Sequence, residues 1–298
     1  MRDPPLRPAE PDLPRLVDLL NEREGSSWEL VRKLPGGYNR GAYELREREG
    51  TRAVLKWRPP RDPTELEDTA ELVRRARAAG WSTPRWIAYG VVADGDEYVI
   101  EELIAGARTA TAADADLSLI ARNNRLQAGL AADRRRDWSR HIWRVIFETD
   151  PTVEARLEAL PATAVVLDRV RALSRDLREV ALPTSDLVHG DCVQDNVLIK
   201  DGTAYLIDAE HCGKGPRAHD LATLLFEATV GGHPLRPSTA GARSIAEECI
   251  AQIGREGLLL CVISTTIEFL AFGLDHWTAD VPNVASRCGE LLSALGSD

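Results

Sequence analysis

The chain has 298 residues, of which 44 % are apolar, and its 47 Asp and Glu outnumber its 37 Lys and Arg to give a formal net charge of −10. This composition is typical of a soluble globular protein of about two domains, and an acidic chain with dispersed arginines has no electrostatic footprint for nucleic acid. The longest apolar run, Leu258 to Ile263, is shorter than a membrane-spanning helix, and Met1 to Pro14 lacks the apolar core of a secretion signal, so we expect no membrane partner.

The cysteines indicate the cellular setting. There are five, an odd number, and they are scattered without any Cys-x-x-Cys spacing. Such a set predicts neither a disulfide framework nor a structural zinc site, and it favours a reducing, cytoplasmic location.

The start of the chain allows two interpretations. Met1 to Asn21 is either a frayed extension or contains a short helix, Leu13 to Leu20, that packs on the following elements. After it, three short apolar stretches separated by Gly-containing turns predict an antiparallel β-meander. The three predicted strands cover residues 28–34, 42–48 and 53–57.

One helix and two more strands are predicted next. Pro63 opens and Gly80 ends a helical stretch over residues 64–79. Strands are expected at 84–89 and 97–103, joined through an Asp-Gly turn.

From Thr109 onward the periodicity of apolar residues is helical, with one exception. Two short β-runs, 197–200 and 203–207, are joined by Asp201-Gly202 and predict a hairpin within a helical region.

Acidic residues are concentrated at the C-terminal end. Residues 1–104 carry 17 basic and 20 acidic side chains, residues 105–185 carry 13 and 11, and residues 186–298 carry 7 and 16. An ordinary solvated surface explains this excess. So does a region that binds divalent cations and a cationic substrate.

The most informative stretch runs from Leu187 to Asp208. Two apolar strands here end in carboxylates, Asp191 and Asp208, and Asn196 follows the first carboxylate by five residues. Because a hairpin brings its arms together, Asn196 and Asp208 are expected to lie close, and an amide oxygen and a carboxylate are suitable ligands for Mg²⁺. Asp191 is then free to accept a proton from a substrate hydroxyl.

His189-Gly190-Asp191-x-x-x-x-Asn196, followed by Ile207-Asp208-x-Glu210, resembles the catalytic and metal-binding motifs of the aminoglycoside phosphotransferase and choline kinase family, whose fold is similar to that of protein kinases. The resemblance extends over roughly residues 28–230. It implies an α+β, two-lobed fold, with an antiparallel β N-lobe carrying one helix and a mainly helical C-lobe. The expected division is a nucleotide-binding lobe at 1–104 and a lobe with the catalytic loop and acceptor site at 105–298.

The family pattern also implies nucleotide contacts in the N-lobe. Lys56, one of only four lysines, occupies the position of the lysine that binds the nucleotide phosphates. The usual helix glutamate that pairs with it is missing at the expected position, Thr69, and Glu65 is the candidate that remains. The residues implied to cover or bind the nucleotide are Gly36, Gly37, Tyr38 and Asn39 in a loop and Glu101, Glu102 and Leu103 at the inter-lobe hinge.

Two residues are expected to support the site rather than react. Asp220, in the segment ending Asp-Leu-Ala, is implied to accept hydrogen bonds from backbone N–H groups of the catalytic loop. His189 is expected to be a hydrogen-bonded scaffold residue, and the thiols of Cys192 and Cys212 are expected to pack without reacting.

These features predict a Mg²⁺-dependent kinase that transfers the γ-phosphoryl group of ATP or GTP to a hydroxyl of a small molecule. We expect a cationic acceptor, an aminoglycoside or another basic antibiotic, so that the enzyme confers resistance. Glu268 and Asp275, seven residues apart, are candidates to bind its ammonium groups, although an internal ion pair with an arginine explains Glu268 equally well. A metabolic kinase for choline, homoserine or a similar compound, and a catalytically silent pseudokinase, are the alternatives.

Overall fold

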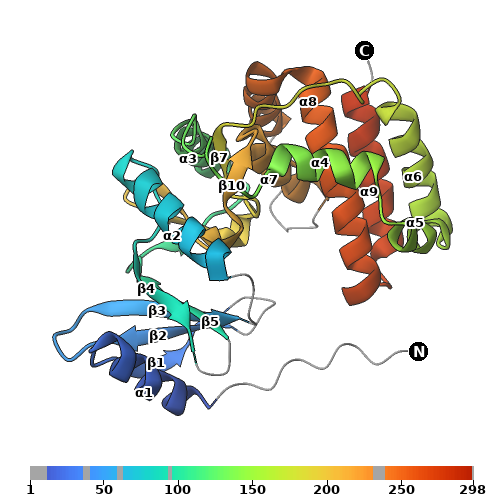
Figure 1. The fold of residues 1–298 in the computed structure, drawn as a ribbon. Coiled ribbons are helices and arrows are strands. Elements are labelled where there is room, and N and C mark those ends of the chain that lie inside the picture. Colours follow the sequence, from blue (N-terminus) through green and yellow to red (C-terminus); the bar gives the residue numbers. More distant parts are fainter. Residues whose placement is uncertain (1–11, 36–40, 59–62, 93–95, 231–238, 297–298) are drawn as a thin grey trace. The chain divides into compact units, whose positions relative to one another are not determined.

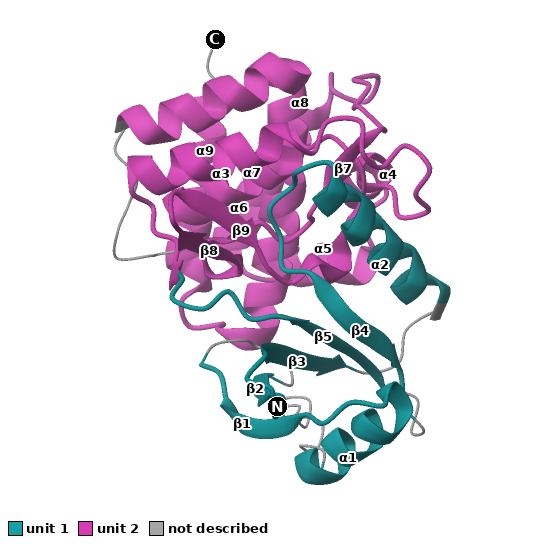
Figure 2. Ribbon diagram, turned by 90° about the vertical axis from the view of Figure 1, so that its left-hand side faces the viewer, with its two compact units in different colours: residues 1–107 teal, residues 108–298 magenta. Residues whose placement is uncertain are grey.

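A computed structural model describes residues 12–35, 41–58, 63–92, 96–230 and 239–296. The chain forms two compact units, Met1–Ala107 and Arg108–Asp298 (Figure 2). This boundary lies three residues beyond the one expected from the sequence.

The first unit is built on a five-stranded antiparallel sheet with strand order β1-β2-β3-β5-β4 (Figure 1). One of its helices, α2 (Pro63–Ala78), is the helix that the sequence predicts. The strands are β1 (Glu29–Lys33), β2 (Ala42–Arg46), β3 (Arg52–Arg58), β4 (Trp86–Val91) and β5 (Glu97–Glu102). The predicted β N-lobe is therefore confirmed, with every strand end within two residues of the one expected.

Helix α1 (Leu13–Glu24) decides between the two interpretations of the N-terminus. Asp12 caps it by accepting a hydrogen bond from the backbone N–H of Arg15, and Gly25, with φ 63°, ends it in the left-handed conformation. Its buried face is Leu16, Val17 and Leu20.

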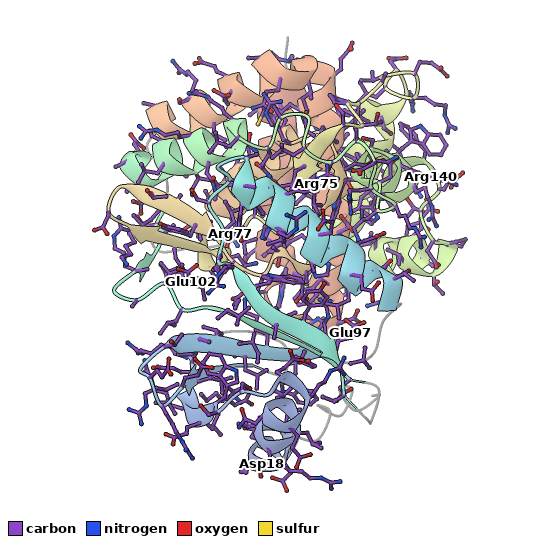
Figure 3. All side chains as sticks on the ribbon, turned by 60° about the vertical axis from the view of Figure 1, so that its left-hand side comes forward. Asp18, Arg75, Arg77, Glu97, Glu102 and Arg140 are labelled. Carbon is purple, nitrogen blue, oxygen red and sulfur yellow. The ribbon has the colours of Figure 1, made fainter. Side chains whose placement is uncertain are left out.

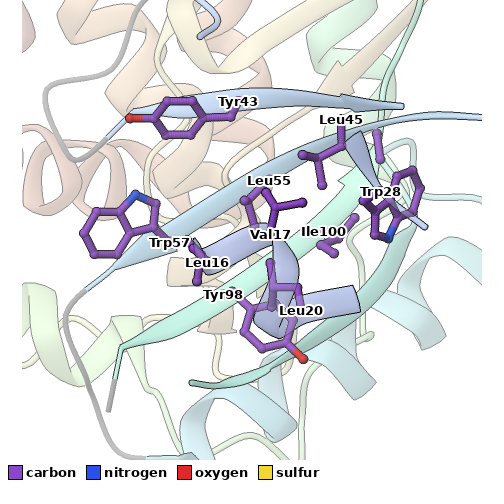
Figure 4. Close-up of a cluster of buried hydrophobic side chains, with 11 residues drawn as sticks. Leu16, Val17, Leu20, Trp28, Tyr43, Leu45, Leu55, Trp57, Tyr98 and Ile100 are labelled. Carbon is purple, nitrogen blue, oxygen red and sulfur yellow. The ribbon is translucent and has the colours of Figure 1, made fainter. Parts of the chain in front are cut away.

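The core of the first unit lies between α1 and one face of the sheet (Figure 4). Leu20 of α1 is fully buried, as are Leu45, Leu55 and Ile100 on the neighbouring strands β2, β3 and β5. Alternation along a strand sends the residues between these apolar ones to the opposite face of the sheet. That face carries the charged residues described below.

The second unit is mainly helical, as the sequence predicts. Its helices are α3 (Asp114–Arg125), α4 (Trp138–Phe147), α5 (Pro151–Glu158), α6 (Pro161–Ser174), α7 (Ala218–Val230), α8 (Thr239–His276) and α9 (Val281–Gly296). The predicted hairpin is also present, formed by β8 (Val197–Lys200) and β9 (Thr203–Leu206), with β6 (Arg108–Thr109) beside β8. A separate two-stranded pair joins β7 (Asp186–Val188) to β10 (Gly213–Gly215).

Helix α8 is longer and more apolar than the run Leu258 to Ile263 suggests. It is the one described helix that could cross a membrane when judged by length and composition alone. However, 67 % of its most apolar 18-residue window is buried inside the protein, and the helix is kinked at Gly254, where φ is 73°. Burial to this extent is typical of a core helix.

Two adjacent leucines of α1 test the packing of the first unit. Leu20→Ala is expected to lower the free energy of unfolding by about 2–5 kcal/mol, because it leaves a cavity in a closed core. Leu19→Ala is the matched control, since Leu19 is 37 % exposed, and it is expected to change stability by no more than about 0.5 kcal/mol. Denaturant unfolding of the full chain measures both, and equal effects would contradict the assigned burial.

Candidate active site

Lys56 lies on the charged face of the first unit's sheet. Lys56 is opposite Val99, and Val54 is opposite Glu101, so Lys56 and Glu101 are diagonal neighbours on one face. Their side chains form an ion pair and are only 17 % and 5 % exposed. The positive charge of the nearly buried Lys56 is therefore balanced by the carboxylate of Glu101 on the adjacent strand β5.

The same face carries two other buried carboxylates with cationic partners. Glu44 accepts hydrogen bonds from Arg32 at 2.9 Å and Arg52 at 2.7 Å, and these guanidinium groups lower the pKa of its carboxyl, Arg52 most. Glu97 is paired with Arg58 at 2.7 Å. The two faces of this sheet thus differ sharply, one apolar under α1 and the other lined with ion pairs.

Glu101 was expected only to supply backbone groups at the hinge. Its side chain was missed as a partner of Lys56 because the pairing of β3 with β5 brings together residues 45 positions apart. The candidate helix residue, Glu65, lies in the first turn of α2, where its backbone carbonyl accepts a hydrogen bond from the Thr69 hydroxyl at 2.7 Å. Its assignment as a partner of Lys56 stays a prediction.

The other expected nucleotide-binding residues divide into two groups. Glu102 lies 3.6 Å from Arg77 of α2, and its backbone N–H donates to the Arg85 carbonyl (Figure 3). Leu103 follows, with its carbonyl accepting from Ala105 N–H at 2.9 Å. Gly36, Gly37, Tyr38 and Asn39 lie outside the described residues.

In the second unit, one carboxylate holds the start of the loop from His189 to Asn196, here called the catalytic loop after the role expected for it from the sequence. Asp220, near the start of α7, is 1 % exposed. Its two oxygens accept hydrogen bonds from the backbone N–H groups of His189 at 2.8 Å and Gly190 at 2.9 Å. Gln127 Nε2 donates to the same carboxylate at 2.7 Å. These are the backbone contacts expected of Asp220 from the sequence.

His189 links the catalytic loop to the end of the hairpin. It is fully buried, and its Nε2 lies 2.8 Å from the Ile207 carbonyl, an acceptor, so Nε2 carries the proton. Nδ1 is then the acceptor for the backbone N–H of Asp191 at 3.3 Å. Both ring nitrogens are occupied by the backbone, which fits a scaffold residue.

Asn196 fixes the position of Asp191. Its Nδ2 donates to Asp191 Oδ2 at 2.7 Å and to the Asp191 carbonyl at 3.0 Å. The Asn196 carbonyl in turn accepts from Ile207 N–H at 2.9 Å, next to the first pair of the hairpin. Since Nδ2 faces a carboxylate, Oδ1 is the atom of the amide that is left to bind a cation.

Asp208 adopts the left-handed conformation, with φ 62°. Burial raises the pKa of Asp191, His189 and the hydrogen bond from Asn196 lower it, and the negative charges of Asp208 and Glu210 raise it further. Asp208 directly follows Ile207, whose N–H donates to the Asn196 carbonyl, so the hairpin brings Asp208 beside Asn196. Glu210 was noted in the sequence motif without a role, and its charge adds to this negative site.

The donor set near Asp191 fits a hard divalent cation. Asn196 Oδ1 and the Asp208 carboxylate are oxygen ligands of the kind that Mg²⁺ prefers, and Mg²⁺ usually takes only one or two protein ligands together with substrate phosphates. Within the described part of the chain, no group of three or more His, Cys, Asp or Glu forms a metal cluster. Asn196 and Asp208 match the small number of protein ligands that Mg²⁺ usually takes.

Cys192 and Cys212 are buried beside this site. Burial raises the pKa of both thiols well above the usual value. A thiol in such surroundings does not ionise readily and is a poor nucleophile.

Glu268 and Asp275 lie on α8, which continues through Gly273. Glu268 is 2.8 Å from His141 Nε2 of α4, and Asp275 is 2.6 Å from Arg156 of α5. The internal partner of Glu268 is therefore a histidine instead of the arginine considered from the sequence. The two carboxylates contact different helices.

Comparisons with known proteins point to one family. A model of the phosphotransferase enzyme family matches residues 30–258. The comparison with curated proteins found no match.

Solved structures share the fold at low sequence identity. Aminoglycoside phosphotransferase APH(4)-Ia is 18 % identical with a TM-score of 0.67, and the match covers 96 % of this chain and 100 % of that one. Amicoumacin kinase hAmiN, in complex with AMP-PNP, Ca²⁺ and Ami, is 16 % identical with a TM-score of 0.67, covering 96 % and 94 %. Choline kinase LicA from Streptococcus pneumoniae is 15 % identical with a TM-score of 0.64, covering 94 % and 99 %.

Replacement of Asp220 tests its hold on the loop. Asp220→Ala is expected to lower the free energy of unfolding by about 3 kcal/mol or more, because three N–H donors lose their acceptor. Asp195→Ala, at an exposed aspartate of the same loop, is the control and is expected to change stability by no more than about 0.5 kcal/mol. Denaturant unfolding measures both, and a near-neutral Asp220→Ala would disprove the assignment.

Proposed function

Because the chain belongs to the phosphotransferase enzyme family, we propose that it transfers the γ-phosphoryl group of a nucleoside triphosphate to a hydroxyl of a small cationic molecule. The acceptor class we propose is an aminoglycoside or another basic antibiotic, so that the reaction gives resistance. The observation that carries the proposal is the hydrogen bond from Asn196 to Asp191 at the hairpin end that leads into Asp208, which brings together a base candidate and two candidate oxygen ligands.

Asp191 is the proposed general base. Its carboxylate accepts the proton of the acceptor hydroxyl, and the hydroxyl oxygen forms a bond to the γ-phosphorus as the bond to the β–γ bridging oxygen breaks. The hydrogen bond from Asn196 Nδ2 holds the carboxylate in one orientation, and the backbone contacts of His189 and Asp220 keep the loop in place. Catalysis of this kind depends on positioning and charge, without a covalent enzyme intermediate.

Asn196 Oδ1 and Asp208 are the proposed ligands of Mg²⁺, which when bound neutralises charge on the nucleotide phosphates. In the first unit, Lys56 is the proposed contact to those phosphates. Glu101 balances the Lys56 charge. The backbone of Glu101, Glu102 and Leu103 is proposed to bind the adenine edge, and residues 36–39 to cover the nucleotide.

The complexes of related folds support a nucleotide donor and a small-molecule acceptor. APH(4)-Ia variants have been solved with ADP and hygromycin B and with AMP-PNP and hygromycin B. The amicoumacin kinase complex holds AMP-PNP and Ca²⁺. ATP or GTP is accordingly our proposed donor. The five free, buried cysteines support a reducing, cytoplasmic location.

A metabolic kinase is the second candidate, favoured by the similarity to choline kinase LicA. Choline is itself a cationic hydroxyl compound, so the acidic balance of residues 186–298 suits it as well as a basic antibiotic. The presence of Lys56, Asp191, Asn196 and Asp208 in one chain argues against a silent pseudokinase.

An acceptor panel tests the function. The full-length protein with Mg²⁺ and γ-labelled ATP or GTP is expected to label aminoglycosides or other basic antibiotics in preference to choline, homoserine and neutral polyols. Asp191→Asn is expected to lower the transfer rate by about 10²-fold or more while nucleotide affinity is kept, because the base contacts the acceptor. Preferred labelling of choline or homoserine would promote the metabolic kinase, and unaltered turnover in Asp191→Asn would refute the assigned base.

Removal of a proposed metal ligand is expected to weaken nucleotide binding, whereas Asp191→Asn is expected to keep it. Asp208→Ala is expected to weaken Mg²⁺-dependent nucleotide binding by about tenfold or more, and Asp208→Asn to have an intermediate effect, because it keeps an oxygen ligand but loses the charge. Titration with ATP at varied Mg²⁺ measures the affinity. Unchanged, still Mg²⁺-dependent affinity in Asp208→Ala would show that the metal lies elsewhere.

A further inference from the structure

The backbone of Asp208, a proposed metal ligand, is strained. Its φ of 62° and ψ of 42° lie in the left-handed region, which is unfavourable for a residue other than glycine. Such a conformation persists only where the structure on both sides of the residue holds it. On the N-terminal side, Ile207 forms hydrogen bonds with the Asn196 carbonyl and with His189 Nε2. On the other side, the turn that follows Asp208 has to be held as well.

The turn after Asp208 is a short 3₁₀ helix, η2 (Ala209–His211), and its last residue is anchored twice. Trp138 Nε1 donates to the His211 carbonyl at 3.1 Å. Arg136 Nη1 lies 3.0 Å from Nδ1 of the His211 ring. The backbone and the side chain of His211 are thus each held by the segment that leads into α4.

The Arg136 guanidinium decides which nitrogen of His211 carries the proton. Because arginine has donors and no acceptor, Nδ1 has to accept, and the ring proton lies on Nε2. Nε2 is 3.5 Å from Oε1 of Glu210. An arginine, an imidazole and a carboxylate are therefore arranged in series, and the carboxylate belongs to the turn that begins directly after Asp208.

The backbone of Arg136 is fixed independently of its side chain. Its carbonyl accepts the backbone N–H of Lys214 at 2.9 Å. A Cβ added at Gly213 would lie 2.8 Å from the same carbonyl oxygen, so the two segments are in close contact. Gly213 and Lys214 belong to β10, which pairs with β7, the strand that leads into the catalytic loop. The guanidinium therefore reaches His211 from a backbone that is docked beside the proposed site.

We propose that Arg136 is a positioning residue for the divalent-cation site. Through the His211 ring it anchors the turn after Asp208, and so it keeps the Asp208 carboxylate in the orientation that binds the cation. Arginine suits this role because it stays protonated, so its donors are present at every physiological pH. The inference rests on the proposed function, which assigns Asp208 to Mg²⁺, and adds to it a residue outside the motifs that resemble the family.

The first test compares three arginine variants by titration with ATP at varied Mg²⁺. Arg136→Met removes the donors but keeps an aliphatic stem, and it is expected to weaken Mg²⁺-dependent ATP binding by about tenfold. Arg136→Lys is expected to recover part of the loss, because an ammonium group also donates to Nδ1. Arg140→Met is the matched control, since Arg140 is an exposed arginine of α4 (Figure 3), and it is expected to leave the affinity unchanged.

ATP affinity with the metal chelated separates positioning from a general loss of structure. This affinity is expected to be the same in Arg136→Met and in the wild type, because only binding that depends on the cation involves Asp208. An equal loss of affinity with and without Mg²⁺, or an equal loss in Arg140→Met, would overturn the role of Arg136.

Substitutions of His211 keep the test valid if Arg136→Met does not fold. His211→Asn keeps an acceptor, Oδ1, near the position of Nδ1, whereas His211→Leu has none. His211→Asn is therefore expected to keep more of the Mg²⁺-dependent affinity than His211→Leu. In the His211→Leu background, Arg136→Lys is expected to have no further effect, since the contact is already lost. Equal affinities in the two His211 variants would contradict the contact.

Nitrogen NMR of the His211 ring tests the anchor without nucleotide. In the wild type the proton is expected on Nε2 alone, and in Arg136→Lys the same tautomer is expected, whereas Arg136→Met is expected to show both tautomers. A wild-type ring with its proton on Nδ1 would overturn the anchor. ATP binding in the wild type that does not respond to Mg²⁺ would overturn the metal assignment of Asp208 and this inference with it. A wild-type response to Mg²⁺ that Arg136→Met retains in full would overturn this inference alone.

Discussion

A single buried carboxylate, that of Asp220, holds in place the loop of the second unit to which we assign the chemistry. It receives the backbone N–H groups of two consecutive residues, His189 and Gly190, where the strand β7 ends and the catalytic loop begins. Burying a backbone N–H group without an acceptor costs free energy. If the loop moved away from Asp220 inside the protein, the N–H groups of His189 and Gly190 would lose their acceptor. The position of Asp191 follows from this constraint.

The remaining contacts extend the same arrangement. His189 ties the loop to Ile207, and Asn196 ties it to both Asp191 and the first residues of the hairpin. Asp208 then lies at the end of the hairpin, close enough for its charge to raise the pKa of Asp191. Shifted pKa values of this kind are common at functional sites.

Local signals in the sequence were sufficient to predict the hairpin and the strands of the first unit. The Asp201-Gly202 turn predicts the hairpin, and the hairpin alone predicts that Asn196 and Asp208 lie close. The strands of the first unit follow from alternation and turn residues. Whether the N-terminal segment forms a helix was not decided from the sequence. The apolar face of α1 is short, and the local pattern does not show the sheet on which that face packs.

Contacts between distant segments were not predictable. The pair Lys56 and Glu101 depends on which strand lies beside β3, and the contact between Trp138 and Gly190 joins residues 52 positions apart. The glycine before Asp191, the proposed base, was noted as part of a motif. The reason for it here, a left-handed backbone and a tryptophan ring pressed against it, depends on the packing of α4.

The measurement that tests this account most directly is amide hydrogen exchange at His189 and Gly190 in the wild-type protein and in Asp220→Asn. If the Asp220 carboxylate fixes the loop, both amides in the wild type exchange as slowly as those of the core strand β7. In Asp220→Asn these two amides should exchange much faster while the amides of α7 and α8 are unchanged. Equal exchange of the two amides in both proteins would contradict the claim that this carboxylate positions the loop.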